Sequence, residues 1–472
     1  MRYRYVVGTV HPIFYQLSHG GMALDNIVER EGKIMAFTLR HTNTRYIRAD
    51  YAVPGLDVDQ ETADEAIGAW ARTMERLFGE RVSSLPGLVH KIATNVWGHK
   101  NPVVWRPPLS PTNTIGTRED RILKATHGPR SELLRWRAWG ELTCWDIERC
   151  YLHIAQNNLP ISEPYAISAQ PKEANTCAVY EADVRIPSME MAPLVGRFME
   201  RPIYPTGSWR GWFWDQELDR AREAGAEITI RRGYAFYTAP ILKPIMQKIE
   251  AAQERYPEYG TSLKLLANML VGKCFAKNKR REWLVGAENE PDGAEWVQIG
   301  PHSPVWYRDK QGTAHLPTYA PAIFSWVTSQ ARCAMWDGVQ GMNPVAMHVD
   351  GFLCASDKEP TSRIEGIKWK KKWQRGGDFK AQCASVWRIS AWDGDDKTNG
   401  LWEGWDLGEE HKIEAERNFN GVRGGNLSDA LKTIKQSAPL INVAPRIFGR
   451  VALDNESGQT RPMQTNEMLA SR

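Results

Sequence analysis

The sequence lacks several features that would assign it to a common class. No run of eighteen or more apolar residues occurs, so we expect no transmembrane helix. The first residues, MRYRYVVGTVHPIFYQ, hold only a short apolar run and no clear cleavage site, so we expect no signal peptide. The seven cysteines are scattered without a CxxC pair, which argues against zinc and against a disulfide framework. We therefore expect a protein of a reducing, cytoplasmic compartment with no membrane contact.

The composition is that of a globular protein with more than one domain. The 472 residues exceed what one ordinary core holds, so we expect at least two domains. Charge is balanced: the net charge of +4 is too small to identify a polyanionic partner by itself. Basic residues nevertheless gather beside aromatic ones, in AKNKRRE (276–282) and IKWKKKW (367–373). This mixture suits a groove that follows phosphates and stacks bases, and a solvated charged surface is the alternative.

The first 118 residues have the pattern of a mixed α/β unit. Residues 32–41 and 44–53 are typical of strands, and residues 60–80 are typical of an amphipathic helix. Residues 99–120 are rich in Pro, Thr and Asn and are expected to form a linker.

One acidic residue stands in the apolar stretch VAMHVDGFLC, residues 345–354. An unpaired buried carboxylate is unfavourable, so such a group neutralises, pairs or binds a metal. The pair Asp350-Gly351 between two apolar runs predicts a hairpin turn at these two residues. Asp350 is therefore either an ordinary turn residue or a ligand at a hairpin tip.

A second carboxylate follows a predicted strand. Leu142 to Ile147 reads as a strand with Asp146 near its end, and a helix is expected over 148–157, ended by Pro160. The end of a strand beside a helix N-terminus suits a metal or a phosphate. The alternative for Asp146 is a helix N-cap.

A cationic helix is expected over residues 260–281. Lys264, Asn268 and Gly272 recur every four residues and so share one face, and the opposite side carries Leu265, Leu266, Met269 and Leu270. The stripe suits a triphosphate, and a solvated helix face is the alternative. Two carboxylates on adjacent strands and a cationic helix together describe a phosphoryl-transfer site with two Mg²⁺ ions about 3.5–4 Å apart.

The order and spacing of these stretches resemble three motifs of the family B DNA polymerases, especially the phage and plasmid branch that includes the protein-primed enzymes. DIERCYLHI (146–154) resembles motif A, KLLANMLVGKCF (264–275) resembles motif B, and MHVDG (347–351) resembles motif C. The resemblance extends over about 120 to 400 and implies an α+β right-hand fold. That fold has an antiparallel palm sheet, helical fingers and a small thumb, here preceded by an α/β N-terminal domain.

The resemblance also implies domain boundaries. They are 1–118 for an N-terminal domain that is degenerate exonuclease-like or accessory, 119–237 for the first part of the palm with motif A, 238–280 for the fingers with motif B, 281–317 for an insertion, 318–398 for the second part of the palm with motif C, and 399–472 for the thumb and tail.

Roles for individual residues follow from the resemblance. Asp146, Asp350 and Lys264 would be catalytic, and Asp146, Asp350 and the backbone carbonyl of Ile147 would bind two Mg²⁺ ions, with Mn²⁺ as a substitute. The residues implied for the nucleotide are Tyr151, Arg255, Lys264, Asn268 and Ile147. Tyr151 would be the steric gate that rejects a ribose 2′-hydroxyl. The residues implied for DNA are Gly128 and Arg130 in HGPRSEL (127–133), and Lys380 and Arg388 in GDFKAQCASVWRIS (377–390).

Several positions depart from the family pattern. His348 replaces the first Asp of motif C, Val271 replaces the motif B tyrosine, and Pro129 replaces a glycine. Arg388 and Ser390 stand where the family often has a lysine and a tyrosine near the primer.

The N-terminal region carries no recognisable exonuclease site. Its acidic triplet, residues 59–61, lies at the start of a predicted helix, where acidic residues are expected for capping. We therefore expect a magnesium-dependent DNA polymerase without proofreading.

Two alternatives stay open: a primase-polymerase that starts without a primer, and a non-catalytic nucleic-acid-binding component of a replisome. The expected partners are primer-template DNA and dNTPs. A separate exonuclease, a terminal protein or a processivity subunit would be further partners. A phage or plasmid origin would place the chain in the cytoplasm of a bacterial host.

Overall fold

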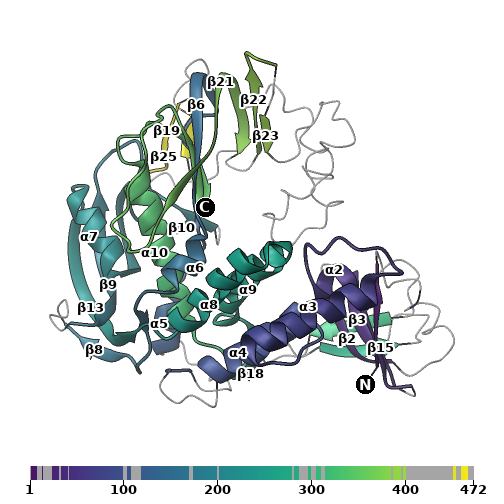
Figure 1. Cartoon of the computed structure of the whole chain (residues 1–472). Helices are drawn as coiled ribbons and strands as arrows, with labels where there is room; N and C mark the ends of the chain where they lie inside the picture. The colour runs from purple at the N-terminus through teal and green to yellow at the C-terminus, as the bar shows by residue number, and fades with distance from the viewer. Residues whose placement is uncertain are drawn as a thin grey trace. The chain divides into compact units, whose positions relative to one another are not determined.

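The computed structural model divides into two compact units (Figure 1). Unit 1 comprises Met1–Ile115 and Pro240–Ala320, and unit 2 comprises Gly116–Ala239 and Pro321–Arg472. The structure describes residues 2–7, 13, 24–30, 33–40, 42–98, 104–107, 118–168, 174–198, 201–278, 281–285, 296–298, 305–309, 314–383, 386–394, 397–399, 450–452 and 459–465. Most of the predicted thumb and tail, 399–472, therefore lies outside the described residues. The division into six domains stays a prediction.

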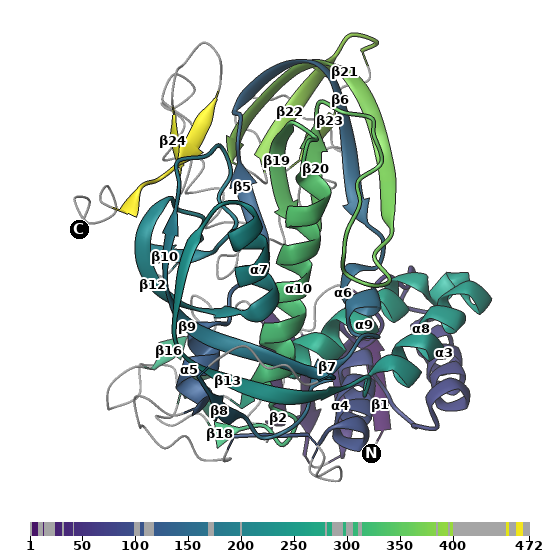
Figure 2. The ribbon, with the colours of Figure 1, turned by 90° about the vertical axis from the view of Figure 1, so that its left-hand side faces the viewer.

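A seven-stranded sheet forms the centre of unit 2 (Figure 2). Every neighbouring pair in it is antiparallel, as predicted for this part of the chain. In pairing order its strands are β23 (Lys397–Asn399), β22 (Val386–Ala391), β21 (Trp369–Cys383), β6 (Arg137–Ile147), β20 (Gly351–Cys354), β19 (Pro344–Val349) and β5 (Arg130–Leu133). One face is closed by a buried apolar cluster, whose members are Leu133, Leu142, Val345, Ala346, Leu353, Phe379, Ala381 and Ile389.

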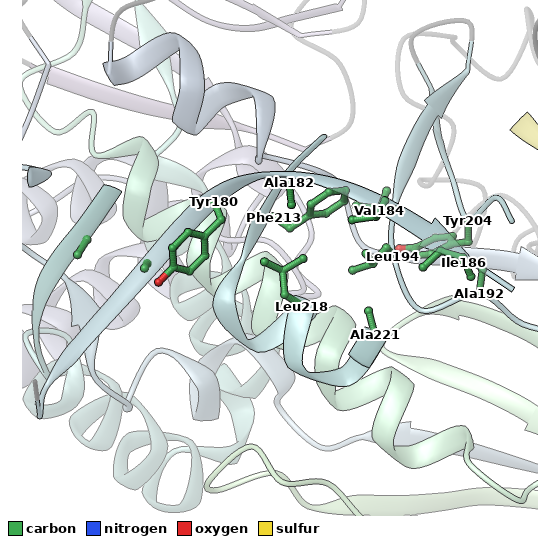
Figure 3. Packing of buried hydrophobic residues seen from close by; sticks show 13 residues of the cluster. Tyr180, Ala182, Val184, Ile186, Ala192, Leu194, Tyr204, Phe213, Leu218 and Ala221 are labelled. Carbon is green, nitrogen blue, oxygen red and sulfur yellow. The ribbon is translucent and has the colours of Figure 1, made fainter. Parts of the chain in front are cut away.

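In a second sheet of unit 2, buried and outward-facing residues alternate along the strand β9. Every second residue of β9, from Ala178 to Ile186, turns to the same face, as the two-residue period of a strand requires. The helix α7 covers that face with Leu218 and Ala221 (Figure 3). In pairing order the strands are β12 (Gly207–Trp214), β9 (Thr176–Ile186), β13 (Glu227–Ala239) and β7 (Leu159–Pro160), with β8 (Tyr165–Ile167) also on β13; α7 is Asp215–Glu223.

The helix α10 (Pro321–Val339) joins the two sheets. Nearly all of its residues are buried, because it packs on both sides. Gly338 lies directly against the ring of Trp369 in the seven-stranded sheet. On the other side Trp326 meets the ring of Trp214 edge-on at 5.0 Å, and the Trp214 indole donates to Ser325 at 2.9 Å. α10 thus forms the central helix of the unit.

The remaining elements of unit 2 are short. They are α5 (Arg118–Lys124), α6 (Cys150–Ile154), β10 (Gly196–Phe198), β11 (Arg201–Ile203), β24 (Arg450–Ala452) and β25 (Thr460–Pro462). The predicted linker 99–120 ends in the first turn of α5.

Unit 1 contains a four-stranded sheet and a set of helices. β1 runs parallel to β4, whereas the other pairs are antiparallel. The strands, in pairing order, are β1 (Arg2–Val6), β4 (Thr44–Arg48), β3 (Lys33–Leu39) and β2 (Leu24–Arg30); the helices are α2 (Ala49–Ala52), α3 (Ala63–Phe78), α4 (Leu85–Val96), α8 (Lys243–Arg255) and α9 (Gly260–Lys273), with the 3-10 turn η1 (Pro257–Tyr259). The strand expected over 44–53 ends at Arg48 because the chain turns into α2, which buries Ala49 and Ala52.

Two small sheets complete unit 1. Their strands are β14 (Lys277–Asn278) with β18 (Ala314–His315), and β15 (Arg281–Val285), β17 (Val305–Asp309) and β16 (Val297–Gln298). The helix predicted over 260–281 therefore ends at Lys273, and its basic end is partly strand. Among the described residues, no helix is both long and apolar enough to cross a membrane.

Buried ion pairs hold α10 to its surroundings. Arg332 pairs with Glu217 of α7 at 2.7 Å, and both side chains are almost fully buried. The same guanidinium donates to the carbonyls of His127 and Gly128, just before β5. A buried charge is tolerated when all its hydrogen bonds are made, so this group ties three segments together.

We expect Arg332→Ala to lower the free energy of unfolding by about 3–5 kcal/mol, because it leaves the Glu217 carboxylate buried and unpaired. Arg222→Ala is the matched control, since Arg222 forms an exposed ion pair with Asp219 on α7, and its loss should change stability by less than about 1 kcal/mol. Urea unfolding of both variants measures the difference. Equal effects would contradict the assigned role of Arg332.

Candidate active site

Strand pairing brings the two predicted carboxylates together in unit 2. Asp146 near the end of β6 pairs with Gly351, the first residue of β20, and Asp350 directly precedes Gly351. The backbone N–H of Ile147 donates to the carbonyl of Asp350 at 2.7 Å. Both carboxylates act on the same neighbouring thiol, that of Cys150, which confirms that they share one locality.

The turn before β20 differs from the predicted one. His348 pairs with Gly351, so the central turn residues are Val349 and Asp350, not Asp350 and Gly351. Val349 has a φ of 62°, a conformation that is strained for a β-branched residue and that glycine normally supplies at this position. Backbone strain of this kind, on the order of 1–3 kcal/mol, concentrates at functional sites.

Gly351 is needed for space and not for a left-handed turn. A Cβ at this position would lie 2.8 Å from Oδ1 of Asp146 and 2.9 Å from the carbonyl oxygen of Trp145. Any side chain would therefore push β6 away from β20. The glycine of the Asp-Gly pair allows the close approach of the two acidic positions.

A lysine that the sequence patterns did not single out completes the site. Nζ of Lys372 lies 2.8 Å from Oδ2 of Asp146. The register of β21 on β6 shifts between Lys371 and Trp373, so Lys372 is the extra residue of a β-bulge. Such bulges re-aim a side chain beside active sites. In the sequence Lys372 stood out only as one member of the basic run 367–373.

The electrostatics of Lys372 agree with this geometry. Burial works to lower the pKa of the Lys372 ammonium, but the hydrogen bond and charge of Asp146 outweigh it, so the pKa is raised. The charge of Asp350 acts in the same direction. Lys372 therefore stays cationic and balances part of the negative charge of the two carboxylates.

The helix after Asp146 is shorter than predicted. It spans Cys150–Ile154 instead of 148–157, and its N-cap is Arg149 with a φ of 49°. The alternative that Asp146 caps this helix is therefore wrong. Tyr151 lies in the first turn of α6 and is half-buried. Burial and the two nearby carboxylates hold the pKa of Cys150 well above its usual value, so this thiol is not a nucleophile.

His348 occupies the position where the family has a further Asp. It is half-buried in β19, opposite Gly351, and desolvation lowers the pKa of its imidazole. The side chain is therefore neutral at pH 7 and does not replace the missing negative charge.

The predicted DNA-binding residues fall into different surroundings. Arg130 is 1% exposed, donates to Glu132 at 2.6 Å and lies 4.0 Å over the ring of Tyr204. In this placement it has no surface to offer to DNA, and the prediction of a DNA contact is replaced by a structural role. Lys380 is half-exposed and pairs with Asp378. Arg388 lies opposite Lys380 in the β21–β22 pair, and Gly128 precedes β5.

The predicted triphosphate residues lie in unit 1. Lys264 and Asn268 are exposed on one face of α9, as the spacing predicts, and Arg255 is exposed at the end of α8. The opposite face buries Leu263, Leu266, Ala267, Leu270 and Val271, whereas Leu265 and Met269 are only partly buried. That these side chains meet Asp146 and Asp350 of unit 2 stays a prediction.

The donor set fits a hard divalent cation. Two carboxylates and the carbonyl of Ile147 offer only oxygen ligands, which Mg²⁺ prefers. Mg²⁺ binds through one or two carboxylates and completes its shell with water and substrate phosphates. Within the described part of the chain no cluster of three or more Asp, Glu, His or Cys side chains occurs, so this pair would leave such positions open for substrate.

Comparison with known proteins gives a match by fold and none by sequence. No protein-family profile matches the chain, and no curated protein sequence matches it. Solved structures of Phi29 DNA polymerase do match. The complex with primer-template DNA and incoming nucleotide substrates has a TM-score of 0.62 at 12% identity, over 87% of this chain and 84% of that chain.

Two other complexes of that polymerase agree. The post-translocation complex with primer-template DNA has a TM-score of 0.58 at 13% identity, over 87% of this chain and 84% of that chain. The complex with single-stranded DNA has a TM-score of 0.59 at 12% identity, over 83% and 81%. The fold of this chain is therefore similar to that of a DNA polymerase, Phi29 DNA polymerase. This similarity confirms the resemblance to the family B branch for the fold alone.

We expect Gly351→Ala to lower the free energy of unfolding by roughly 1–3 kcal/mol, because the new methyl group meets a backbone oxygen that cannot move freely. Gly128→Ala is the control, since a Cβ there meets nothing within 4 Å. Chemical denaturation compares the two variants. A Gly351→Ala protein as stable as the control would contradict the close approach of β20 to β6.

Proposed function

We propose that the chain is a template-directed DNA polymerase that transfers nucleotides from dNTPs to a primer 3′-hydroxyl. The observation that carries the proposal is the placement of Asp350 in the turn directly before Gly351, the residue of β20 that pairs with Asp146 of β6. It is supported by the fold of Phi29 DNA polymerase and by the order of the three motifs. A turn residue without a ligand would have no reason to lie beside a second carboxylate.

The reaction forms one bond and breaks one. The primer 3′-oxygen bonds to the α-phosphorus of the dNTP, and pyrophosphate leaves. Two Mg²⁺ ions, held by Asp146, Asp350 and the carbonyl of Ile147, would acidify the primer hydroxyl and neutralise the charge that develops on the phosphates.

The other roles belong to side chains on separate elements. Lys264, Arg255 and Asn268 present donors on the exposed faces of α8 and α9, where they would hold the triphosphate. Tyr151 in α6 would lie under the sugar and select deoxyribose. Lys372 keeps Asp146 oriented and limits the repulsion between the two carboxylates.

We propose that this polymerase lacks proofreading. The acidic triplet of the N-terminal region serves local structure. Asp59 accepts hydrogen bonds from the N–H and hydroxyl of Thr62, and these bonds lower the pKa of its carboxyl group. Gln60 bonds to the backbone of Tyr5 and Val7 in and after β1. A separate exonuclease, a terminal protein or a processivity subunit would then be partners besides primer-template DNA.

We expect magnesium-dependent extension of a primed template with dNTPs, and a loss on the order of 10²–10³-fold or more in Asp350→Asn and Asp146→Asn. Asp357→Asn is the control, because Asp357 is an exposed carboxylate a few residues after β20. Ribonucleotides and an unprimed template are offered in parallel, and a 3′-labelled strand reports degradation.

Each alternative has its own result in this assay. Product on the unprimed template would establish a primase-polymerase. Label lost from the 3′-end would contradict the absence of proofreading. DNA binding without incorporation, under every condition, would contradict the polymerase and favour the non-catalytic component.

We expect Lys372→Ala to lower the half-saturating Mg²⁺ concentration roughly 1.5- to 5-fold, because it removes a cation that competes for Asp146. Lys371→Ala is the matched control: its ammonium bonds to Gln374 and lies 5.7 Å over the ring of Trp145. Extension rates over a Mg²⁺ titration separate the two. An equal shift in both variants would show that only general surface charge matters.

A further inference from the structure

A cavity of about 400 Å³ lies along the outer edge of β12 in unit 2. Among the described strands β12 pairs with β9 alone and forms an edge of its sheet. The C-terminal segment covers the start of this edge, where Thr206 bonds to Met463 and Thr465, and Ser208 to Thr465. Beyond Ser208 no described strand pairs with the edge, and Gly196 and Arg197 of β10 line the cavity there. We call it the edge cavity.

The floor of the edge cavity is rigid. Val195 and Phe213 line it, and both belong to the hydrophobic core between β9 and α7, where Figure 3 shows Phe213 beside Ala182. Such a floor does not collapse onto the empty space. A preformed concave site of this size suits a small ligand or one unit of a polymer.

The walls carry positive charge. Lys124, Arg197 and Arg210 line the edge cavity, and no acidic side chain is among its described lining residues. Each cation is held in place: Lys124 by Asp120 at 3.0 Å, Arg197 by the carbonyl of Thr126 at 3.0 Å, and Arg210 by Asp183 at 2.7 Å.

The carboxylate of Asp183 is shared between two cations, because it pairs with Arg210 and with Arg231. Alternation along β12 directs the backbone N–H groups of Arg210 and Trp212 to the same outer side as that of Ser208, which adds donors for an anion.

Two polar side chains of the cavity wall are buried. The indole N–H of Trp209 has no hydrogen-bond acceptor among the described residues. His127 is 8% exposed. Burial and the charges of Arg332 and Arg197 hold the pKa of His127 well below its usual value. The neutral ring thus offers one donor and one acceptor. Buried polar groups normally have partners, so the Trp209 indole points to a ligand that supplies an acceptor.

We propose that the edge cavity binds a nucleotide, with its base against Trp209 and its phosphate at Lys124, Arg197 and Arg210. Aromatic rings stack bases of any sequence, and cations flanking them hold the phosphate. The ligand is either a free nucleotide or the unpaired end of a DNA strand. For its nucleic-acid partner this proposal rests on the proposed polymerase function. Neither Asp146 nor Asp350 lines the edge cavity.

The test is photo-crosslinking of the full-length protein, with the labelled peptides identified by mass spectrometry. One probe is 8-azido-dATP, and the other is a short single strand that carries 5-iododeoxyuridine. We expect label on the peptide around Trp209. Arg197→Ala/Arg210→Ala should reduce that label about tenfold, while primer extension stays unchanged. Arg185→Ala/Arg222→Ala is the matched control, since both side chains are exposed in unit 2 outside the cavity.

The outcomes separate the sources and the two proposals. Label from the single strand alone identifies an unpaired DNA end, and label from 8-azido-dATP alone identifies a free nucleotide. Label that is unchanged in Arg197→Ala/Arg210→Ala, or absent around Trp209, overturns the proposal. A cavity that takes an acidic peptide and neither nucleotide probe also overturns it, in favour of a protein partner. If the unmodified protein is labelled around Trp209 but does not extend a primer, only the proposed polymerase function is contradicted.

Discussion

The pairing of Gly351 with Asp146 decides where the second carboxylate of the site lies. Because Asp350 directly precedes Gly351, any register that keeps this pair also keeps the two acids together. Like charges at short range raise the free energy of the folded state unless a cation compensates them. Lys372 provides part of that compensation from β21, and under our proposal a divalent ion at the oxygen-only donor set provides the rest. Gly351 leaves the space that the close approach of β20 to β6 requires, and the strained φ of Val349 lies in the turn just before it.

The rest of unit 2 holds these strands in register. α10 packs between the two sheets, and Arg332 links it to α7 and to the segment before β5. Arg130 belongs to the same support: it is buried at the start of β5, which pairs with β19 and thereby fixes one side of the Asp350 hairpin. A residue that resembles a template-binding arginine is in this chain part of the frame of the seven-stranded sheet.

Patterns of short range were predictable from the sequence. The spacing of residues along the chain located α3 and α9, and the acids at 146 and 350 were found because a lone carboxylate in an apolar strand needs a reason. Features that depend on pairing were not predictable. The bulge that aims Lys372 exists only against β6, and the burial of Arg130 needs Glu132, Tyr204 and Trp336 around it. Gly351 was correctly noticed but for the wrong reason, because steric space across strands leaves no local signal.

The most direct measurement is affinity cleavage by bound iron. Fe²⁺ replaces Mg²⁺ at oxygen sites, and with ascorbate and peroxide it cuts the backbone beside the place where it binds. We expect cuts near residues 146 and 350 that Mg²⁺ suppresses and that Asp146→Asn/Asp350→Asn abolishes. Cuts at only one of these two positions, or none at either in the folded protein, would contradict a shared cation site between β6 and the β19–β20 turn.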